Sequence, residues 1–204
     1  MLGLPKSTEI NKTLPKKAVF DKFKPNAADR KLFDDQISRL AIVAEISPQT
    51  VTVTAGTDVS AVYVILVTLK TAECHKNNIA LLSKLIDQRM LFILQYGDSA
   101  RLAVYRAAKV LVSESKPIDE WKLNLSGLDL GAIWENIIAE VGGIDLTGGK
   151  DLDATIAEKD RREKLNKQIA ALEKKAMSER QPRRKWELAE EVKKLKRELE
   201  DNPL

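Results

Sequence analysis

The chain has 204 residues, 44% hydrophobic and 31% charged, which suits one domain with an appended segment or two small domains. Its 34 Lys/Arg and 30 Asp/Glu give a net charge of +4, too small to identify a nucleic-acid-binding protein by itself. The single cysteine, Cys74, excludes an internal disulfide. The single histidine, His75, excludes any site that needs two histidines.

The N-terminus lacks the continuous apolar segment that is typical of a secretory signal. The longest apolar run, residues 61–69, is far shorter than the roughly 20 residues that a membrane-spanning helix needs. We therefore expect a soluble cytoplasmic protein with no membrane segment.

The first 30 residues are basic, with seven Lys/Arg against three Asp/Glu, and contain Pro5, Pro15 and Pro25. Prolines at this spacing predict an extended arm that packs onto the domain, with a short helix able to start at Pro15. Two interpretations of the lysines remain open. Lys16 and Lys17 either lie on nucleic acid or are simply solvated.

Hydrophobic periodicity predicts a mixed order of helices and strands up to residue 147. The expected helices cover residues 27–47, 77–89 and 128–141, and the expected strands cover residues 50–54, 59–69, 90–95, 101–112 and 121–125. Helices that alternate with strands predict an α/β (or α+β) fold, a single mixed sheet flanked by helices. We expect this domain to span residues 1–147.

From Gly148-Gly149 the composition changes, and 28 of the last 54 residues are charged. Apolar residues recur there at steps of three and four, in two stretches that Pro182 separates. The pattern predicts helices at residues 153–178 and 184–201, a charged hairpin or coiled-coil tail over residues 148–204. The stripe residues expected to pack on each other, on the domain or on a partner are Leu165, Ile169, Leu172, Leu188, Val192, Leu195 and Leu199.

Asp58 precedes the most apolar strand and Lys70 ends it, an order that resembles the restriction-endonuclease core. That chemistry uses two carboxylates to hold Mg²⁺ and a lysine to stabilise charge. Here Thr68 occupies the position of the second carboxylate. A threonine hydroxyl cannot replace that charge, so the nuclease hypothesis is weakened. The plain alternative is that Asp58 is a turn residue and Lys70 a solvated charge.

Cys74 and His75 are adjacent, and adjacent helical side chains do not face each other, so a nucleophilic pair is disfavoured. A metal site at this pair would need ligands from elsewhere in the chain. We expect no metal and no cofactor outside the Mg²⁺ of the nuclease alternative.

The segment from Glu179 to Leu188 concentrates cations around one tryptophan, with Arg183, Arg184 and Lys185 directly before Trp186. Arginine and lysine bind phosphates, and an aromatic ring can stack on a base or a protein partner. The alternative, which we favoured on the sequence, is that Trp186 caps the core where the tail folds back.

Several segments together resemble the bacterial family known as domain of unknown function 4391, over nearly the whole chain. They are Leu4-Pro5 through Leu14-Pro15-Lys16, Ile37–Leu40, Ile46–Val51 and Gln181–Leu188, followed by a Lys/Glu/Leu tail. Pro182 and Arg183 stand where the family has an aromatic-polar pair. The resemblance implies a setting beside helicase and DNA-methyltransferase genes, and hence a role in restriction or phage defence.

These observations predict a non-catalytic accessory subunit of a bacterial DNA-handling or phage-defence system. Its tail would dock a protein partner or self-associate through the stripe residues. The alternatives are a Mg²⁺-dependent nuclease that uses Asp58 and Lys70, and a degenerate nuclease-fold protein that binds nucleic acid through its basic ends.

Overall fold

The computed structural model describes residues 2–145 and 151–200. The chain divides into two compact units, Met1–Asp145 and Leu146–Leu204, which we call the α/β unit and the hairpin unit. The boundary expected at residues 147–148 lies outside the described residues. No helix in the described ranges has the length and apolar character needed to cross a membrane.

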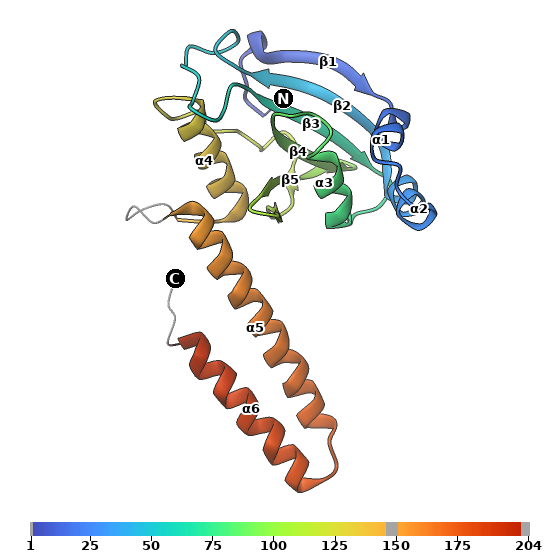
Figure 1. Ribbon diagram of the computed structural model, residues 1–204, viewed down its shortest axis with the longest axis vertical. Helices are drawn as coiled ribbons and strands as arrows, with labels where there is room; N and C mark the ends of the chain where they lie inside the picture. Colours follow the sequence, from blue (N-terminus) through green and yellow to red (C-terminus); the bar gives the residue numbers. More distant parts are fainter. Residues whose placement is uncertain (1, 146–150, 201–204) are drawn as a thin grey trace. The chain divides into compact units, whose positions relative to one another are not determined.

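The α/β unit is built on one seven-stranded sheet whose main path follows the chain order β1-β2-β3-β4-β5-β6 (Figure 1). The strands are β1 (Glu9–Leu14), β2 (Ile37–Ile46), β3 (Val62–Leu69), β4 (Arg89–Tyr96), β5 (Ser99–Arg106), β6 (Lys109–Val112) and β7 (Lys116–Pro117). Among the pairings between the named strands, only β3–β4 is parallel, and a helix forms the crossover connection that a parallel pair requires. The expected mixed α/β fold is therefore confirmed.

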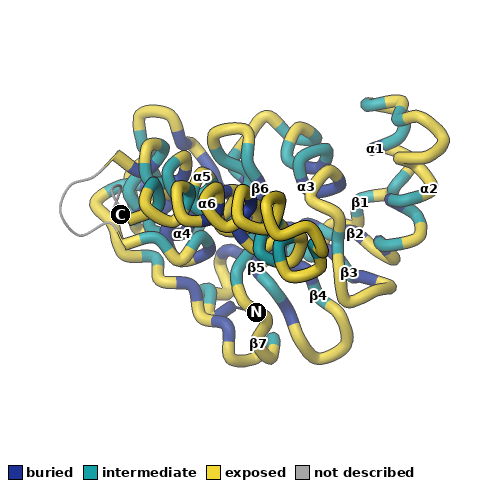
Figure 2. Tube along the Cα trace, turned by 90° about the horizontal axis from the view of Figure 1, so that it is seen from below, coloured by how far each residue is buried: buried dark blue, intermediate teal, exposed yellow. Residues whose placement is uncertain are grey.

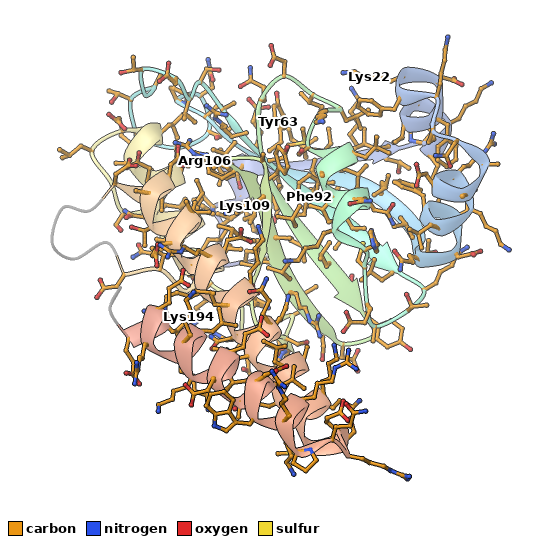
Figure 3. The ribbon with its side chains drawn as sticks, turned by 60° about the horizontal axis from the view of Figure 1, so that its bottom comes forward. Lys22, Tyr63, Phe92, Arg106, Lys109 and Lys194 are labelled. Atoms are coloured by element: carbon orange, nitrogen blue, oxygen red, sulfur yellow. The ribbon has the colours of Figure 1, made fainter. Side chains whose placement is uncertain are left out.

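Helices cover both faces of the sheet. They are η1 (Lys6–Thr8), α1 (Lys16–Phe23), α2 (Ala27–Gln36), α3 (Lys76–Leu82) and α4 (Leu130–Gly142). Val19, Phe33 and Ile79, from α1, α2 and α3, join strand residues such as Ile65 and Phe92 in one buried cluster (Figure 3). Because strand side chains alternate, their neighbours point to the opposite face, where α4 packs against β5 and β6.

The N-terminal segment was predicted as an extended arm packed on the domain, with a short helix able to start at Pro15. The packing and the helix are confirmed, but residues 9–14 belong to the sheet and do not form an arm. Residues 9–14 form the edge strand β1, which pairs antiparallel with β2, and residues 16–23 form α1 behind Pro15. Val19 is fully buried and Phe20 meets the ring of Phe33 edge-on, with 5.3 Å between ring centroids. The apolar residues of this segment therefore complete the sheet and its helical layer.

The predicted helix over residues 27–47 ends early. Asn26 caps α2 as expected, through its side-chain oxygen and the Asp29 N–H, but the chain extends from Ile37 into β2. Ile37–Ile46 is rich in β-branched residues and pairs with β3 along its length. The apolar residues of this segment happen to be spaced by three and four positions, which imitates a helix although the segment forms a strand.

Four other predicted elements differ from the structure. Residues 50–54 form turns, with an isolated bridge from Thr54 to Asp129, and residues 121–125 form no strand. The helix expected to reach Arg89 ends at Leu82. The predicted strand over residues 101–112 is instead the β5–β6 hairpin, with Ala107 and Ala108 both at positive φ. A turn of this kind is normally marked by Asn or Gly, so the sequence carried no signal for it.

The hairpin unit consists of α5 (Leu152–Ser178) and α6 (Pro182–Glu200), which run side by side (Figure 1). Both helices were expected within two residues of these bounds. Asp151 caps α5 through the Ala154 N–H, at 2.9 Å. Proline is favoured in the first turn of a helix, where its missing N–H costs nothing, so Pro182 opens α6.

Candidate nucleic-acid interface

The apolar stripes of the hairpin unit meet each other. Leu165, Ile169, Leu188 and Val192 are between 6% and 9% exposed, and Leu172, Leu195 and Leu199 are half-buried. Since α5 and α6 contact each other extensively, these side chains form one narrow seam between the two helices. A protein that docked on the seam would first have to part the helices.

Ion pairs join the two helices across the seam. Arg161 donates to Glu198 at 2.7 Å and Lys196 Nζ lies 2.8 Å from a Glu173 oxygen. The hydrogen bond to Glu198, with the charge of Glu158, raises the pKa of Arg161 above its ordinary value. Exposed pairs of this kind add little stability but keep the two helices in register.

A short turn at residues 179–181 connects the helices and is organised by the Glu179 carboxylate. This carboxylate accepts the backbone N–H groups of Arg180 at 2.8 Å and Gln181 at 3.0 Å. The Gln181 N–H is the main cause of a Glu179 pKa below its ordinary value, assisted by the Arg180 N–H and by the charges of Arg184 and Lys175. An ionised acid is thus engaged in the turn itself.

Exposed cations surround this turn, together with two exposed apolar side chains. We call the set the tip patch: Lys174, Lys175, Met177, Arg180, Arg183, Arg184, Lys185 and Trp186. Residues 174–187 contain six Lys/Arg and two Asp/Glu, a net charge of +4. The first 30 residues also hold a net charge of +4, and the residues outside these two segments sum to −4, so the tip patch is one of two basic segments of the chain.

Trp186 lies outside the seam of the hairpin unit. Its surface is 66% exposed, against 5% for Trp121 and 2% for Trp134. The helical phase explains this, because Trp186 precedes Leu188 by two residues and so lies about 160° around α6 from the seam. In Figure 2 most residues of α6 are coloured as exposed.

The N-terminal lysines are less available than the tip patch. Lys16 Nζ lies 3.0 Å from Asp34 Oδ1 and its side chain is 23% exposed, so it ties α1 to α2. Lys17 is exposed on α1. Lys22, on the same helix, donates to the Leu85 carbonyl at 2.7 Å (Figure 3). Two of the seven basic residues of this segment, Lys16 and Lys22, therefore have a local structural partner, and Lys17 is exposed.

The structure does not bring Asp58 and Lys70 together. Asp58 precedes the first residue of β3 and Lys70 follows its last, so the eight residues of the strand, about 26 Å, lie between them. Lys70 Nζ donates to the Asp34 carbonyl at 2.6 Å, near the C-terminus of α2, where a cation is favourable. The pair cannot act on one shared metal ion in this arrangement.

Two cavities mark the opposite ends of β3 and β4. One of about 740 Å³ contains Asp58, with Asp87, Arg89 and Tyr105 in its lining. The other, of about 540 Å³, lies at the carboxyl ends of these parallel strands. Open α/β sheets bind ligands at that end of the sheet.

The carboxyl-end cavity contains a polar network that the sequence did not reveal. Gln36 Oε1 accepts the His75 N–H at 2.8 Å and the Asn78 side-chain amide at 2.9 Å. His75 caps α3 through the Asn77 N–H, at 3.3 Å, as expected for a residue at a helix start. The network joins α2 to α3, and only the three-dimensional pairing places Gln36 beside residues forty positions away.

Cys74 and Arg101 also line this cavity. Burial raises the pKa of the Cys74 thiol to about 11, so the thiol is protonated at neutral pH and is a poor nucleophile. Arg101 lies 3.6 Å from a carboxylate oxygen of Glu73. Within residues 2–145 and 151–200, no three His, Cys, Asp or Glu side chains converge in a way that could hold a metal ion.

The fold and its charged hairpin define a two-unit protein: a mixed α/β sheet followed by a two-helix arm. The family model described as Domain of unknown function (DUF4391) matches residues 2–199, so the chain belongs to this family. The expected resemblance is therefore confirmed. The comparisons with curated proteins and with solved structures found no match.

Proposed function

We propose that this protein is a non-catalytic accessory subunit of a bacterial DNA-handling or phage-defence system, and that its tip patch contacts nucleic-acid phosphates. One observation carries the proposal. Residues 174–187 hold a net charge of +4 at the exposed end of a helical hairpin, while the remaining residues sum to zero. Phosphate binding by Lys and Arg is driven by this kind of local charge and by counterion release.

The cations of the tip patch are free to change partners at little cost. Arg183 Nε lies 3.4 Å from a Glu187 oxygen, but the two side chains are 93% and 56% exposed. An exposed pair of this kind is worth at most about 1 kcal/mol, so a phosphate can replace the carboxylate. Glu179, the other acid of the segment, is already engaged by backbone N–H groups.

Two alternatives receive less support from the geometry. A protein partner on the seam would have to separate α5 from α6 and expose side chains such as Ile169 and Val192, which are less than 10% exposed. A nuclease that pairs Asp58 with Lys70 would have to act across the length of β3. The tip patch needs no rearrangement to meet a ligand.

The test compares two charge-neutralised variants of the full-length chain in binding to a 20-nucleotide DNA at several salt concentrations. R183Q/R184Q/K185Q removes three cations from the tip patch, and K193Q/K194Q/R197Q removes three from the exposed part of α6 away from the turn. We expect the first variant to lower the slope of log K against log salt by about 2 to 3. The control variant should retain a slope close to that of the parent.

Equal losses in the two variants would assign binding to the overall charge of the hairpin and would overturn the proposal. Binding without salt dependence would do the same, because it would exclude phosphate contacts. Copurification from the native host would then identify the protein partner of the seam alternative.

A further inference from the structure

An exposed aromatic ring stands among the cations of the tip patch. Trp186 is 66% exposed, and Met177 at the end of α5 is 81% exposed. Tryptophan is normally largely buried in a folded protein, since its exposure leaves a large apolar surface in water. Neither the seam nor any hydrogen bond among the described residues accounts for the position of this ring.

Four cations lie close to Trp186 in the sequence, three of them on α6. Arg183 precedes Trp186 by three residues, which places the two side chains on one side of α6. Lys185 is adjacent in sequence, and Arg184 and Arg180 lie within two turns. A ligand that lies along this side of α6 would meet Arg183 on the N-terminal side of the ring, with the exposed acid Glu190 one turn beyond it.

We propose that the tip patch prefers single-stranded nucleic acid, in which Trp186 stacks on an unpaired base while the nearby cations neutralise phosphates. This inference rests on the proposed function, since it specifies the ligand of the same patch. In a duplex each base face is covered by its neighbours, so the ring of Trp186 would find no partner there. In a single strand the base faces are accessible, and stacking on them tolerates any sequence.

An acidic protein segment is the other ligand that the cations would fit, but it would leave the ring unused. Carboxylates neutralise arginine and lysine, yet they offer no planar surface for Trp186. The combination of ring and cations therefore favours a polyanion that also carries planar bases. Poly-glutamate serves as the acidic comparison in the test.

The experiment titrates the full-length protein with a 20-nucleotide oligothymidylate, with a 20-base-pair duplex and with poly-L-glutamate, and follows tryptophan fluorescence. The chain has three tryptophans, of which Trp121 and Trp134 are buried, so quenching by a surface ligand reports on Trp186. We expect quenching and tighter binding with the single strand. Trp186→Ala should weaken single-strand binding about tenfold and abolish the quenching, and Trp186→Phe should retain part of the affinity.

Met177→Ala is the matched control, because it removes an exposed apolar side chain from the same patch without removing a ring. It should leave the preference for single strands unchanged. Equal affinity for duplex and single strand, or unaltered binding by Trp186→Ala, would overturn this inference. The proposed phosphate contact is tested separately. It would stand if R183Q/R184Q/K185Q still lowered the slope of log K against log salt while the control variant did not. Tightest binding to poly-L-glutamate would instead identify an acidic protein ligand.

Discussion

The two units of this chain differ in what their side chains are used for. The α/β unit encloses large apolar residues on both faces of a sheet, with Phe33, Phe92 and Trp134 no more than 2% exposed. The hairpin unit buries a single narrow seam and leaves most of its remaining surface charged. The difference indicates that most of the buried apolar core lies in the first unit, and it agrees with our proposal that the second unit carries the ligand-binding surface.

Charge separates the units in the same way. In the α/β unit, Lys16, Lys22 and Lys70 each contact an acid or a backbone carbonyl that ties two elements together. In the hairpin unit, Lys194 is exposed on α6 (Figure 3), and the tip patch carries a net charge of +4. Both units therefore contain basic residues that join two elements, such as Lys16 in the first and Lys196 in the second, and the hairpin unit carries in addition the exposed cations of the tip patch.

The largest effect on stability is expected from a substitution that creates a cavity beside the sheet. Phe92 lies at the centre of β4 and is fully buried among residues of α1, α2 and α3. Phe92→Ala should lower the free energy of unfolding by about 3–5 kcal/mol. Urea denaturation followed by the fluorescence of Trp121 and Trp134 measures this loss. A cost below about 1 kcal/mol would contradict the central place given to the α/β core.

A smaller loss of stability is expected from a substitution in the seam between α5 and α6. Ile169→Ala removes a side chain that is 6% exposed between only two helices, so it should cost about 2 kcal/mol within the hairpin. Far-ultraviolet circular dichroism should show a loss of helix at a lower temperature, while the near-ultraviolet signal of the buried tryptophans is retained. A simultaneous loss of both signals would show that the two units unfold as one.

The burial of the Cys74 thiol in the α/β unit should slow its reaction with alkylating reagents. With its pKa raised to about 11, Cys74 should react with iodoacetamide at pH 8 at least about tenfold more slowly than the same thiol in the urea-unfolded chain. The rate should rise with pH until about 11, because thiolate accumulates only as the pH approaches the raised pKa. A rate that levels off near pH 9 would contradict the burial of this group.

The smallest effect on stability is expected from removing one helix cap in each unit. Asp129 accepts the Ala132 N–H at 2.9 Å at the start of α4, and Asp151 makes the equivalent 2.9 Å contact with Ala154 on α5. Asp129→Ala should cost about 1 kcal/mol of global stability, and Asp151→Ala a similar amount confined to the hairpin. Thermal melts of the two variants, followed at near- and far-ultraviolet wavelengths, make the comparison. Equal shifts of the near-ultraviolet transition would contradict the independence of the units.

Local patterns predicted the parts of the fold that depend on local chemistry. The caps at Asn26 and His75, the buried run that became β3, and both helices of the hairpin are readable because each has a periodicity or a cap of its own. Residues 37–46 could not be assigned correctly, since their three- and four-residue spacing fits a helix until β3 pairs with them. The Ala107-Ala108 turn was missed because its positive φ values have no compositional mark.

The candidate site was only partly predictable. The cations and the tryptophan of residues 183–186 were evident as a cluster, but exposure of Trp186 depends on its phase relative to the seam, which needs both helices. The strand between Asp58 and Lys70 was predicted, and the structure confirms it as β3, which keeps these two residues at opposite ends of the strand. Gln36 gave no signal, because its partners lie forty residues away.

The central claim, that nucleic acid meets the hairpin tip rather than the α/β unit, is tested most directly by photochemical crosslinking. The full-length protein would be irradiated with a single-stranded oligonucleotide that contains 5-bromodeoxyuridine, and the crosslinked peptides mapped by mass spectrometry. The account predicts crosslinks within residues 174–187, centred on Trp186, and their loss at high salt. Crosslinks confined to residues 2–145 would contradict it.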